Sequence, residues 1–348
     1  MYEYNSLYGI HIEFTSRCNL LCPQCARTKN GSVNPDLPLE NMSLDTVEKI
    51  FNEMGKKIKY VHICGNYGDF VAYPYALEAI DIIQKSGVEF IKIYTNGSAR
   101  PESFWTELAD KLSNNRGQIV FSIDGLEDTN HLYRVNSNFQ KIIHNAKAFI
   151  DAGGTAIWEW LPFEHNEHQV EDAAKMAKRL GFAEFILKKN PRFSPINNGE
   201  HHLLKPSTKY IHEGVKRQEK QIMGKTQQLT PTMFPISCKY NARKMIFIDF
   251  QGYVLPCCWH GNRFNPDSKS GANEFQKIME GYDPKIFNVN YYSIEEILNN
   301  PWYRKDMDYT IKILNTCRKH CPLGNKMSNK DNRVQHVFKD VLDLEPWE

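Results

Sequence analysis

Apolar and polar positions alternate along the first 190 residues in two recurring patterns. Short extended runs such as 8–14 (YGIHIEF) and 58–64 (IKYVHIC) favour strands, whereas 44–54 (LDTVEKIFNEM) has helical spacing between Ser43 as N-cap and Gly55 as stop. Repetition of this strand–helix pair predicts an α/β fold, with six βα units in a partial (βα)6, TIM-like barrel. The other predicted strands are 89–94, 118–123, 155–161 and 183–188, and the other predicted helices are 75–86, 102–113, 139–152 and 167–180.

The pattern changes after residue 190, where prolines interrupt the chain. We predict a barrel domain over 1–190 and interpret 191–236, with one predicted helix at 208–222, as a bridging segment. A small cysteine-rich domain is expected over 237–324, followed by a C-terminal tail over 325–348. These two parts are predicted to contain strands at 243–249 and 252–255, a polar loop that includes glycine, a helix that begins near Ser293, and a helix at 331–342.

Three cysteines follow the first predicted strand. Cys18, Cys22 and Cys25 form a CxxxCxxC spacing within 11–27 (HIEFTSRCNLLCPQCAR), where polar residues and a proline favour a loop. Structural zinc takes four ligands and a [4Fe-4S] cluster usually takes four cysteines, so three cysteines would leave one iron of a cluster open. We expect the loop at the carboxyl ends of the strands, where ligands bind in such sheets. Three buried core cysteines are the alternative interpretation.

Composition narrows the class of protein. The chain has 348 residues, a net charge of +2 and 24% charged residues, which indicates neither a nucleic-acid nor a membrane surface. The N-terminus lacks the pattern of a signal peptide and no run of eighteen apolar residues occurs, so we expect a cytoplasmic protein. The nine clustered cysteines then favour reduced, metal-binding thiols over disulfides.

The CxxxCxxC loop resembles the cluster loop of the radical S-adenosylmethionine (SAM) enzymes. In that family three cysteines hold a [4Fe-4S] cluster, and its remaining iron binds the amino and carboxylate groups of SAM. The resemblance implies that Cys18, Cys22 and Cys25 hold such a cluster in this chain. It also implies reductive cleavage of SAM to methionine and a 5'-deoxyadenosyl radical.

Other strand ends resemble SAM-binding motifs of the same family. The segment 64–69 (CGNYGD) is similar to the GGEP motif, whose glycines let backbone carbonyls approach the SAM ammonium, but its glutamate position is not cleanly matched. The turn 95–97 (TNG) resembles the turn near the SAM ribose, and 122–125 (SIDG) with Arg134 resembles the segment that holds the carboxylate and ribose. An ordinary βα turn and a solvated arginine are the alternatives. The resemblance implies SAM contacts from Gly65, Asn66, Gly68, Asp69, Thr95, Asn96, Ser122, Asp124 and Arg134.

The fifth predicted strand suggests substrate contacts. It carries Trp158, Glu159 and Trp160, whose side chains alternate between the two faces of a strand. Either these residues serve barrel packing, or Glu159 points into the barrel mouth as a polar substrate contact. Asn166, in the following FEHNEHQ segment, is a second candidate for the mouth, although a solvated loop would have the same composition.

Five cysteines lie in the C-terminal part. The segment 248–259 (IDFQGYVLPCCW) resembles the hairpin of SPASM and twitch domains, and Gly252 and Cys257 fit its G-x4-C spacing better than Cys258 does. A full SPASM domain carries about seven cysteines for two auxiliary clusters, so five favour a twitch-like arrangement with one. The resemblance implies one auxiliary [4Fe-4S] cluster held by Cys238, Cys257, Cys317 and Cys321.

Alternatives remain for these cysteines. The same four would fit a structural zinc site, and three of them could hold a cluster with one iron open to substrate. Cys64 and Cys258 stay outside both predicted ligand sets. Each is either a small buried residue or a hydrogen-atom donor, because a thiol can quench a carbon radical as in radical epimerases.

The resemblance implies an enzyme whose deoxyadenosyl radical abstracts a hydrogen atom from a peptide or small molecule. Oxidation (dehydrogenation) or another modification would follow, with the auxiliary cluster assisting electron transfer, and an epimerase with a free cysteine as donor is an alternative. Expected partners are the substrate and an electron donor such as flavodoxin or ferredoxin, with no membrane and no nucleic acid. A non-catalytic metal-binding interaction protein is the alternative from a different class, and the altered 64–69 segment is consistent with it.

Overall fold

The computed structural model describes residues 2–113, 116–188, 204–205, 207, 209–210, 236–264, 269–321 and 334–339. The chain forms two compact units, each assembled from separate stretches. Unit 1 comprises Met1–Cys18, Val33–Ile93 and Leu229–Met327, and unit 2 comprises Asn19–Ser32, Tyr94–Gln228 and Ser328–Glu348. The predicted helix at 208–222 lies almost wholly outside the described residues. No described helix is both long enough and apolar enough to span a bilayer.

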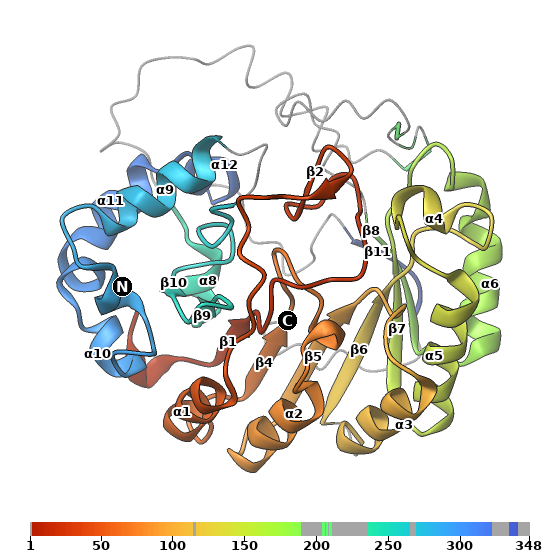
Figure 1. The fold of residues 1–348 in the computed structure, drawn as a ribbon, viewed down its shortest axis with the longest axis horizontal. Helices are drawn as coiled ribbons and strands as arrows, with labels where there is room; N and C mark the ends of the chain where they lie inside the picture. Colours follow the sequence, from red (N-terminus) through yellow and green to blue (C-terminus); the bar gives the residue numbers. More distant parts are fainter. Residues whose placement is uncertain are drawn as a thin grey trace. The chain divides into compact units, whose positions relative to one another are not determined.

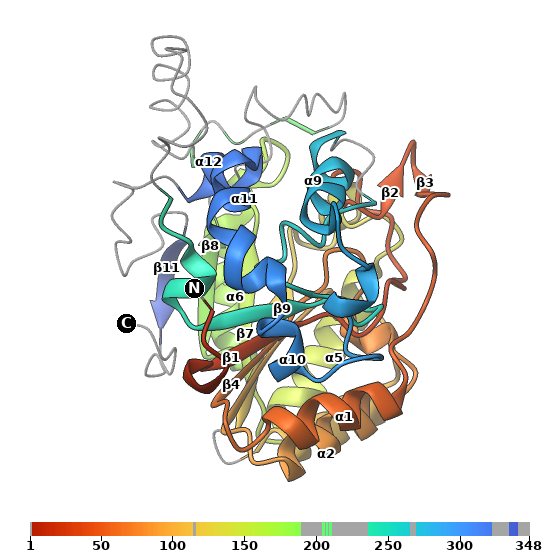
Figure 2. The ribbon, with the colours of Figure 1, turned by 90° about the vertical axis from the view of Figure 1, so that its left-hand side faces the viewer.

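Unit 1 is built on a sheet with the strand order β10, β9, β1, β4, β5. β1 (Gly9–Ile12) pairs in parallel with β4 (Tyr60–Ile63) on one side and with β9 (Met245–Ile248) on the other. β5 (Phe90–Thr95) is parallel to β4, and β10 (Val254–Leu255) is antiparallel to β9. Figure 2 shows β9 beside β1 and β4. The C-terminal hairpin therefore extends the sheet that the N-terminal strands begin.

Two amphipathic helices follow β1 and β4. α1 (Leu44–Met54) and α2 (Ala76–Lys85) pack against each other, and Figure 1 shows both on the same side of β1, β4 and β5. The Ser43 side chain accepts the Thr46 N–H, as expected of an N-cap. The apolar face of α1 follows helical spacing and consists of Val47, Ile50, Phe51 and Met54.

The C-terminal part of unit 1 is mainly helical. The predicted helix near Ser293 is confirmed, because a capping box of Ser293 and Glu296 begins α10. The predicted polar loop before it is partly wrong, since it contains the amphipathic helix α9. The helices are α8 (Lys239–Ala242), α9 (Lys269–Met279), α10 (Ile294–Leu298), α11 (Met307–Ile313) and α12 (Asn315–His320), with η7 (Pro284–Phe287) and the π-helical turn η8 (Trp302–Asp306) between them.

Unit 2 continues the alternation of strands and helices. Its strand order is β6, β7, β8, β11, in which β6 (Gly117–Ser122), β7 (Thr155–Trp160) and β8 (Glu184–Lys188) are parallel. This alternation confirms the α/β fold class. Its helices are α3 (Glu102–Lys111), α4 (Asn130–Tyr133), α5 (Phe139–Asp151) and α6 (Val170–Leu180), preceded by η3 (Glu167–Gln169). The short strands β2 (Thr28–Lys29) and β3 (Ser32–Val33) form a separate ladder.

The predicted helix at 331–342 is wrong. Val334–Lys339 is a strand, β11, which pairs antiparallel with β8. Its sequence VQHVFK carries valine and phenylalanine, which are enriched in strands, and the edge of β8 supplies backbone partners for it. This segment is a strand because it pairs with β8, which is distant in the sequence, and a local sequence pattern does not show such pairing.

A close approach between two loops of unit 1 depends on Gly68. A Cβ atom at this position would overlap the carbonyl oxygen of Thr15 and would lie 3.1 Å from that of Arg17. The Asp69 N–H donates to the same Arg17 carbonyl at 2.9 Å. Gly68 therefore lets the loop after β4 lie directly against the loop after β1.

We predict that Gly68→Ala destabilises the protein by roughly 3 kcal/mol or more, because neither backbone segment can move away cheaply. Gly31→Ala is the control: it has a φ of +75° and open space around it, so only its left-handed backbone should cost about 1 kcal/mol. Urea unfolding monitored by circular dichroism would measure both. Equal losses in the two variants would contradict this role of Gly68.

Candidate active site and metal centre

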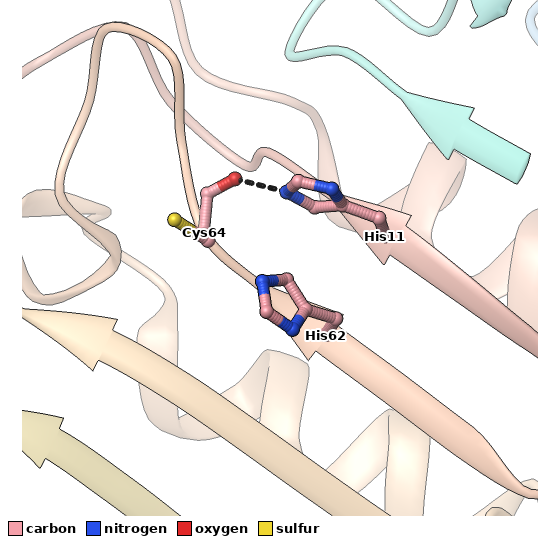
Figure 3. A group of neighbouring side chains, drawn as sticks. All are labelled: His11, His62 and Cys64. Atoms are coloured by element: carbon pink, nitrogen blue, oxygen red, sulfur yellow. Dashed lines mark hydrogen bonds between the residues drawn. The ribbon is translucent and has the colours of Figure 1, made fainter. Parts of the chain in front are cut away.

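Polar side chains lie on one face of β1 and β4. His11 and Glu13 alternate with Ile10 and Ile12, which are fully buried, so the two polar residues share the opposite face. His62 is the register partner of His11 on β4, and the two rings lie 4.5 Å apart. Figure 3 shows both imidazoles together with Cys64, which follows β4. The sequence pattern thus collects chemically active groups at the ends of two adjacent strands.

The group of His11, His62 and Cys64 has the composition of a metal site, since its potential ligand atoms lie within 4.8 Å of one another. Hydrogen bonds nevertheless occupy both nitrogens of His11. Nε2 donates to the Cys64 carbonyl at 2.7 Å (Figure 3), and Nδ1 accepts the Tyr240 hydroxyl at 2.6 Å. Burial lowers the pKa of His11 to about 4, so the ring is neutral and these partners fix its tautomer. We therefore interpret the group as a hydrogen-bonded cluster.

Glu13 anchors the segment 65–69. Its Oε1 accepts the N–H groups of Tyr67 at 2.8 Å and Gly68 at 3.0 Å, whereas Oε2 has no hydrogen-bond partner among the described residues. Burial raises the pKa of Glu13 to about 8, although the surrounding backbone N–H groups lower it. Sequence reasoning missed Glu13, but the polar–apolar alternation in HIEF contained the signal.

The predicted SAM-binding residues in this segment also make structural contacts. Asn66 Nδ2 donates to the Cys258 carbonyl at 2.8 Å, and the Asp69 carboxylate accepts the Val71 N–H to begin η2 (Phe70–Ala72). A Cβ atom at Gly65 would lie 2.7 Å from Glu13 Oε1. The side chains of Asn66 and Asp69 thus bind the protein itself. SAM binding by Gly65, Asn66, Gly68 and Asp69 stays a prediction.

The cysteine loop continues from Cys18, the last residue of its stretch in unit 1, into unit 2. Within unit 2 the Cys25 N–H donates to the Cys22 carbonyl at 3.0 Å, which closes a turn. The buried Arg27 donates to the Leu20 carbonyl at 3.0 Å and so supports the loop through its backbone. Sequence reasoning missed Arg27, because a basic residue beside a loop resembles a solvated one.

The turn 95–97 holds the cysteine loop. Asn96 Nδ2 donates to Asn19 Oδ1 at 3.1 Å, and Asn19 Nδ2 donates to Ser98 Oγ at 2.8 Å. The Thr95 hydroxyl accepts the Gly97 N–H at 3.1 Å and shapes the turn. Thr95 and Asn96 therefore position the loop that carries Cys22 and Cys25, while their predicted contact with SAM stays a prediction.

Asp124 and Arg134 form a buried ion pair beside the cysteine loop. Arg134 Nε donates to Asp124 Oδ2 at 2.7 Å, and Asp124 Oδ1 accepts the Leu161 N–H at 2.6 Å. Burial lowers the pKa of Arg134, but Asp124 and Cys22 raise it more, so the guanidinium stays charged next to Cys22. Ser122 ends β6 two residues before Asp124. This placement suits a group that binds an anionic ligand at the cysteine loop.

The two predicted substrate residues differ in placement. Glu159 lies at the end of β7, and both of its oxygens lie 3.1 Å from Lys188 Nζ. Trp158 and Trp160 are fully buried, as expected for packing residues on the other face. The expectation that Asn166 lines an open mouth is corrected: it is fully buried, and its amide donates to the carbonyls of Asp124 and Leu161. Asn166 holds the loop after β7.

Four cysteines converge in unit 1. Burial raises the pKa of the Cys257 thiol, and the nearby Cys258, Cys238 and Cys317 raise it further. In addition to burial, Cys238 raises the pKa of Cys321, and Cys321 raises the pKa of Cys317. The Cys321 N–H donates to the Cys317 carbonyl at 2.8 Å. Four buried or partly buried sulfur donors around one position fit an iron–sulfur cluster or zinc.

Cys258 belongs to a different environment. Burial and, to a smaller extent, the Glu13 carboxylate raise its pKa to about 11, and Tyr240 is its hydrogen-bond partner. Tyr240 in turn donates to His11, as described above. Cys257 thus lies among the other cysteines, whereas Cys258 contacts Tyr240 and lies near both Glu13 and Cys257. The assignment of Cys238, Cys257, Cys317 and Cys321 as ligands stays a prediction that this geometry supports.

We predict that Glu13→Gln changes how stability depends on pH. The pKa of Glu13 is about 8 in the folded protein, above its ordinary value, so the unfolded state releases this proton at lower pH. The wild type should therefore lose stability between about pH 5 and pH 8 relative to Glu13→Gln, by up to roughly 4 kcal/mol. Urea unfolding at several pH values measures this, with the exposed Glu127→Gln as control. If stability depends on pH in the same way in all three proteins, the raised pKa of the buried Glu13 carboxyl is contradicted.

Comparisons with known proteins complement this geometry. The family model for the radical SAM superfamily matches residues 12–177, and the model for SPASM, an iron–sulfur cluster-binding domain, matches residues 238–322. A comparison with curated proteins found no match.

Several solved structures share the fold. Streptococcus suis SuiB bound to S-adenosylmethionine is similar with 14% identity and a TM-score of 0.58, over 85% of this chain and 67% of that one. SuiB bound to the precursor peptide SuiA has 14% identity and a TM-score of 0.57, over 86% of this chain and 66% of that one. Histidine-tagged anSMEcpe with bound AdoMet has 16% identity and a TM-score of 0.51, over 86% of this chain and 79% of that one. The chain thus spans about two thirds of the length of SuiB.

These findings agree with the cysteine sets described above. A radical SAM domain implies SAM with a [4Fe-4S] cluster, and a SPASM domain implies auxiliary iron–sulfur binding. The chain therefore carries a radical SAM domain and, at its C-terminal side, a SPASM-type domain, with SAM and iron–sulfur clusters as its cofactors.

Proposed function

We propose that this enzyme abstracts a hydrogen atom from an unreactive C–H bond of a peptide or small molecule and then oxidises the substrate radical through one auxiliary [4Fe-4S] cluster. The observation that carries the proposal is the convergence of Cys238, Cys257, Cys317 and Cys321. Four cysteines suffice for one cluster, which supports a single auxiliary electron acceptor.

In this proposal Cys18, Cys22 and Cys25 hold the first cluster, which with bound SAM supplies the deoxyadenosyl radical. Glu13 fixes the segment 65–69 through two backbone N–H groups, so that its carbonyls are positioned for the SAM ammonium. Asp124 holds Arg134 through Nε alone, so the terminal guanidinium nitrogens are oriented for the SAM carboxylate. These residues bind and orient, and the buried surroundings exclude water that would intercept a reactive species.

Dehydrogenation needs the substrate to lose one hydrogen atom, one electron and one proton. The hydrogen atom would go to the deoxyadenosyl radical, the electron to the cluster proposed at the four converging cysteines, and the proton to solvent. We assign Glu159 to substrate contact, since its carboxylate ends β7 and Lys188 holds both of its oxygens. A flavodoxin or ferredoxin is the proposed electron donor for SAM cleavage.

The substrate class in this proposal includes peptides. SuiB has been solved with its precursor peptide SuiA, and this chain shares the fold of SuiB. That similarity concerns the fold, so the assignment of a peptide or small-molecule substrate depends on the chemistry of the strand ends described above.

A second function fits one specific observation. The Cys258 thiol is hydrogen-bonded to Tyr240 and lies close to both Glu13 and Cys257. A thiol in this place suits a hydrogen-atom donor, and the second candidate function is therefore an epimerase that uses Cys258. Cys64, the other cysteine outside both ligand sets, offers its carbonyl to His11, and we regard its thiol as the weaker candidate.

We predict that replacing Cys18, Cys22 and Cys25 together by Ala abolishes formation of 5'-deoxyadenosine while about four irons per chain remain, because the auxiliary site has its own ligands. Anaerobic reconstitution, iron and sulfide analysis, and chromatography after dithionite reduction with SAM would measure this. SAM cleavage that survives the triple substitution would contradict the assignment of these cysteines.

The adjacent pair Cys257 and Cys258 offers a matched test of the auxiliary ligands. Cys257→Ala should lower iron from about eight to about four per chain, whereas Cys258→Ala should retain about eight. If both variants retain SAM cleavage but only Cys258→Ala blocks conversion of substrate, the epimerase is favoured over the dehydrogenase. Loss of iron in Cys258→Ala alone would overturn the ligand assignment.

A further inference from the structure

His260 occupies the space between two of the four converging cysteines. Its Nδ1 lies 3.7 Å from Cys257 Sγ, and its Nε2 lies 3.5 Å from Cys317 Sγ. The residue is 1% exposed, so water does not compete for either ring nitrogen. Among the described residues, its ring nitrogens have no other hydrogen-bond partner. Both polar atoms of a buried imidazole are thus directed at predicted cluster ligands.

His260 directs an N–H at a cysteine sulfur in either of its neutral tautomers. A neutral imidazole carries one N–H, on Nδ1 or on Nε2. Because each nitrogen faces a cysteine sulfur, whichever one carries the hydrogen directs it at a ligand atom. Hydrogen bonds to the sulfurs are among the factors that set the potential of an iron–sulfur cluster, since an N–H dipole favours the added negative charge of the reduced state.

A second polar side chain at the site behaves differently. The Tyr2 hydroxyl lies 3.6 Å from Cys238 Sγ, but it has a single hydrogen and lies 2.7 Å from the Pro256 carbonyl, to which it donates. Tyr2 therefore packs against the ligand set without donating to it. This contrast identifies Tyr2 as a natural control for His260, because both residues are buried against predicted ligands.

We propose that His260 donates an N–H···S hydrogen bond to the ligand set of Cys238, Cys257, Cys317 and Cys321 and thereby raises the reduction potential of the auxiliary cluster. This inference rests on the proposed function, because it requires a cluster at these cysteines. In the proposed dehydrogenation the cluster accepts the electron of the substrate radical, so a higher potential makes this step more favourable. His260 acts as a positioning residue that tunes the cluster without touching the substrate.

The test uses the full chain with Cys18, Cys22 and Cys25 replaced by Ala, so that only the auxiliary cluster contributes to the signal. A redox titration followed by electron paramagnetic resonance then gives the midpoint potential. In His260→Phe, which keeps the ring but removes both nitrogens, the oxidised-to-reduced ratio at a fixed potential should rise about tenfold, equivalent to about 59 mV toward lower potential. Tyr2→Phe should change the ratio less than about twofold.

Amide variants separate a hydrogen bond from packing. The amide nitrogen of Gln reaches about the position of Nε2, facing Cys317, and that of Asn reaches about the position of Nδ1, facing Cys257. Recovery of the wild-type potential in His260→Gln or in His260→Asn would support a hydrogen bond from His260 to a ligand sulfur. An unchanged potential in His260→Phe, or a shift that neither amide restores, would overturn the proposal.

Two further outcomes are distinguishable. Iron analysis of the triple Ala background comes first: if no iron binds there, the auxiliary site of the proposed function fails and this inference fails with it. If about four irons bind and His260→Phe leaves the potential unchanged, only the inference fails. A strong nitrogen hyperfine coupling that disappears in His260→Phe would also overturn it, because His260 would then be an iron ligand.

Discussion

The structure of unit 1 depends on the parallel pairing of β1 with two partners. β4 lies on one side of β1 and β9 on the other, although more than 180 residues separate β4 from β9 in the chain. This pairing brings the segment after β4 and the C-terminal cysteine region to the same strand. His11 contacts Tyr240, and Glu13 lies beside Cys258, only because β9 occupies that edge. The two ladders on either side of β1 thus join the segment after β4 to the C-terminal cysteine region.

The polar face of β1 and β4 shows how the enzyme uses burial. His11 and Glu13 carry groups that water would normally solvate. Burial lowers the pKa of His11 and raises the pKa of Glu13, and both shifts favour the neutral side chain. Backbone N–H and C=O groups replace part of that solvation. Side-chain partners replace water in the same way where Asn96 holds Asn19 and where Asp124 holds Arg134. Many of the polar groups at these strand ends therefore also fix the conformation of the loops that would bind SAM.

Periodicity predicted the barrel strands and helices well, because each βα unit carries its own local pattern. α1, for example, begins and ends where Ser43 and the 44–54 run indicate. Long-range pairing was not predictable: β9 joins β1, and β11 joins β8 in place of a helix. At the site, spacing singled out the cysteines, whereas Arg27 and His260 became visible only through their contacts. Asn166 shows the converse, since a polar residue in a polar loop proved fully buried.

The central claim is that the chain holds two clusters of different purpose, one that cleaves SAM and one that accepts an electron. Anaerobic reconstitution of the wild type with iron and sulfide, then reduction with dithionite in the presence of SAM, tests it most directly. The account predicts about eight irons per chain together with formation of 5'-deoxyadenosine. Zinc, or about four irons, without 5'-deoxyadenosine would contradict it and would favour a metal-binding protein that has the fold but not the chemistry.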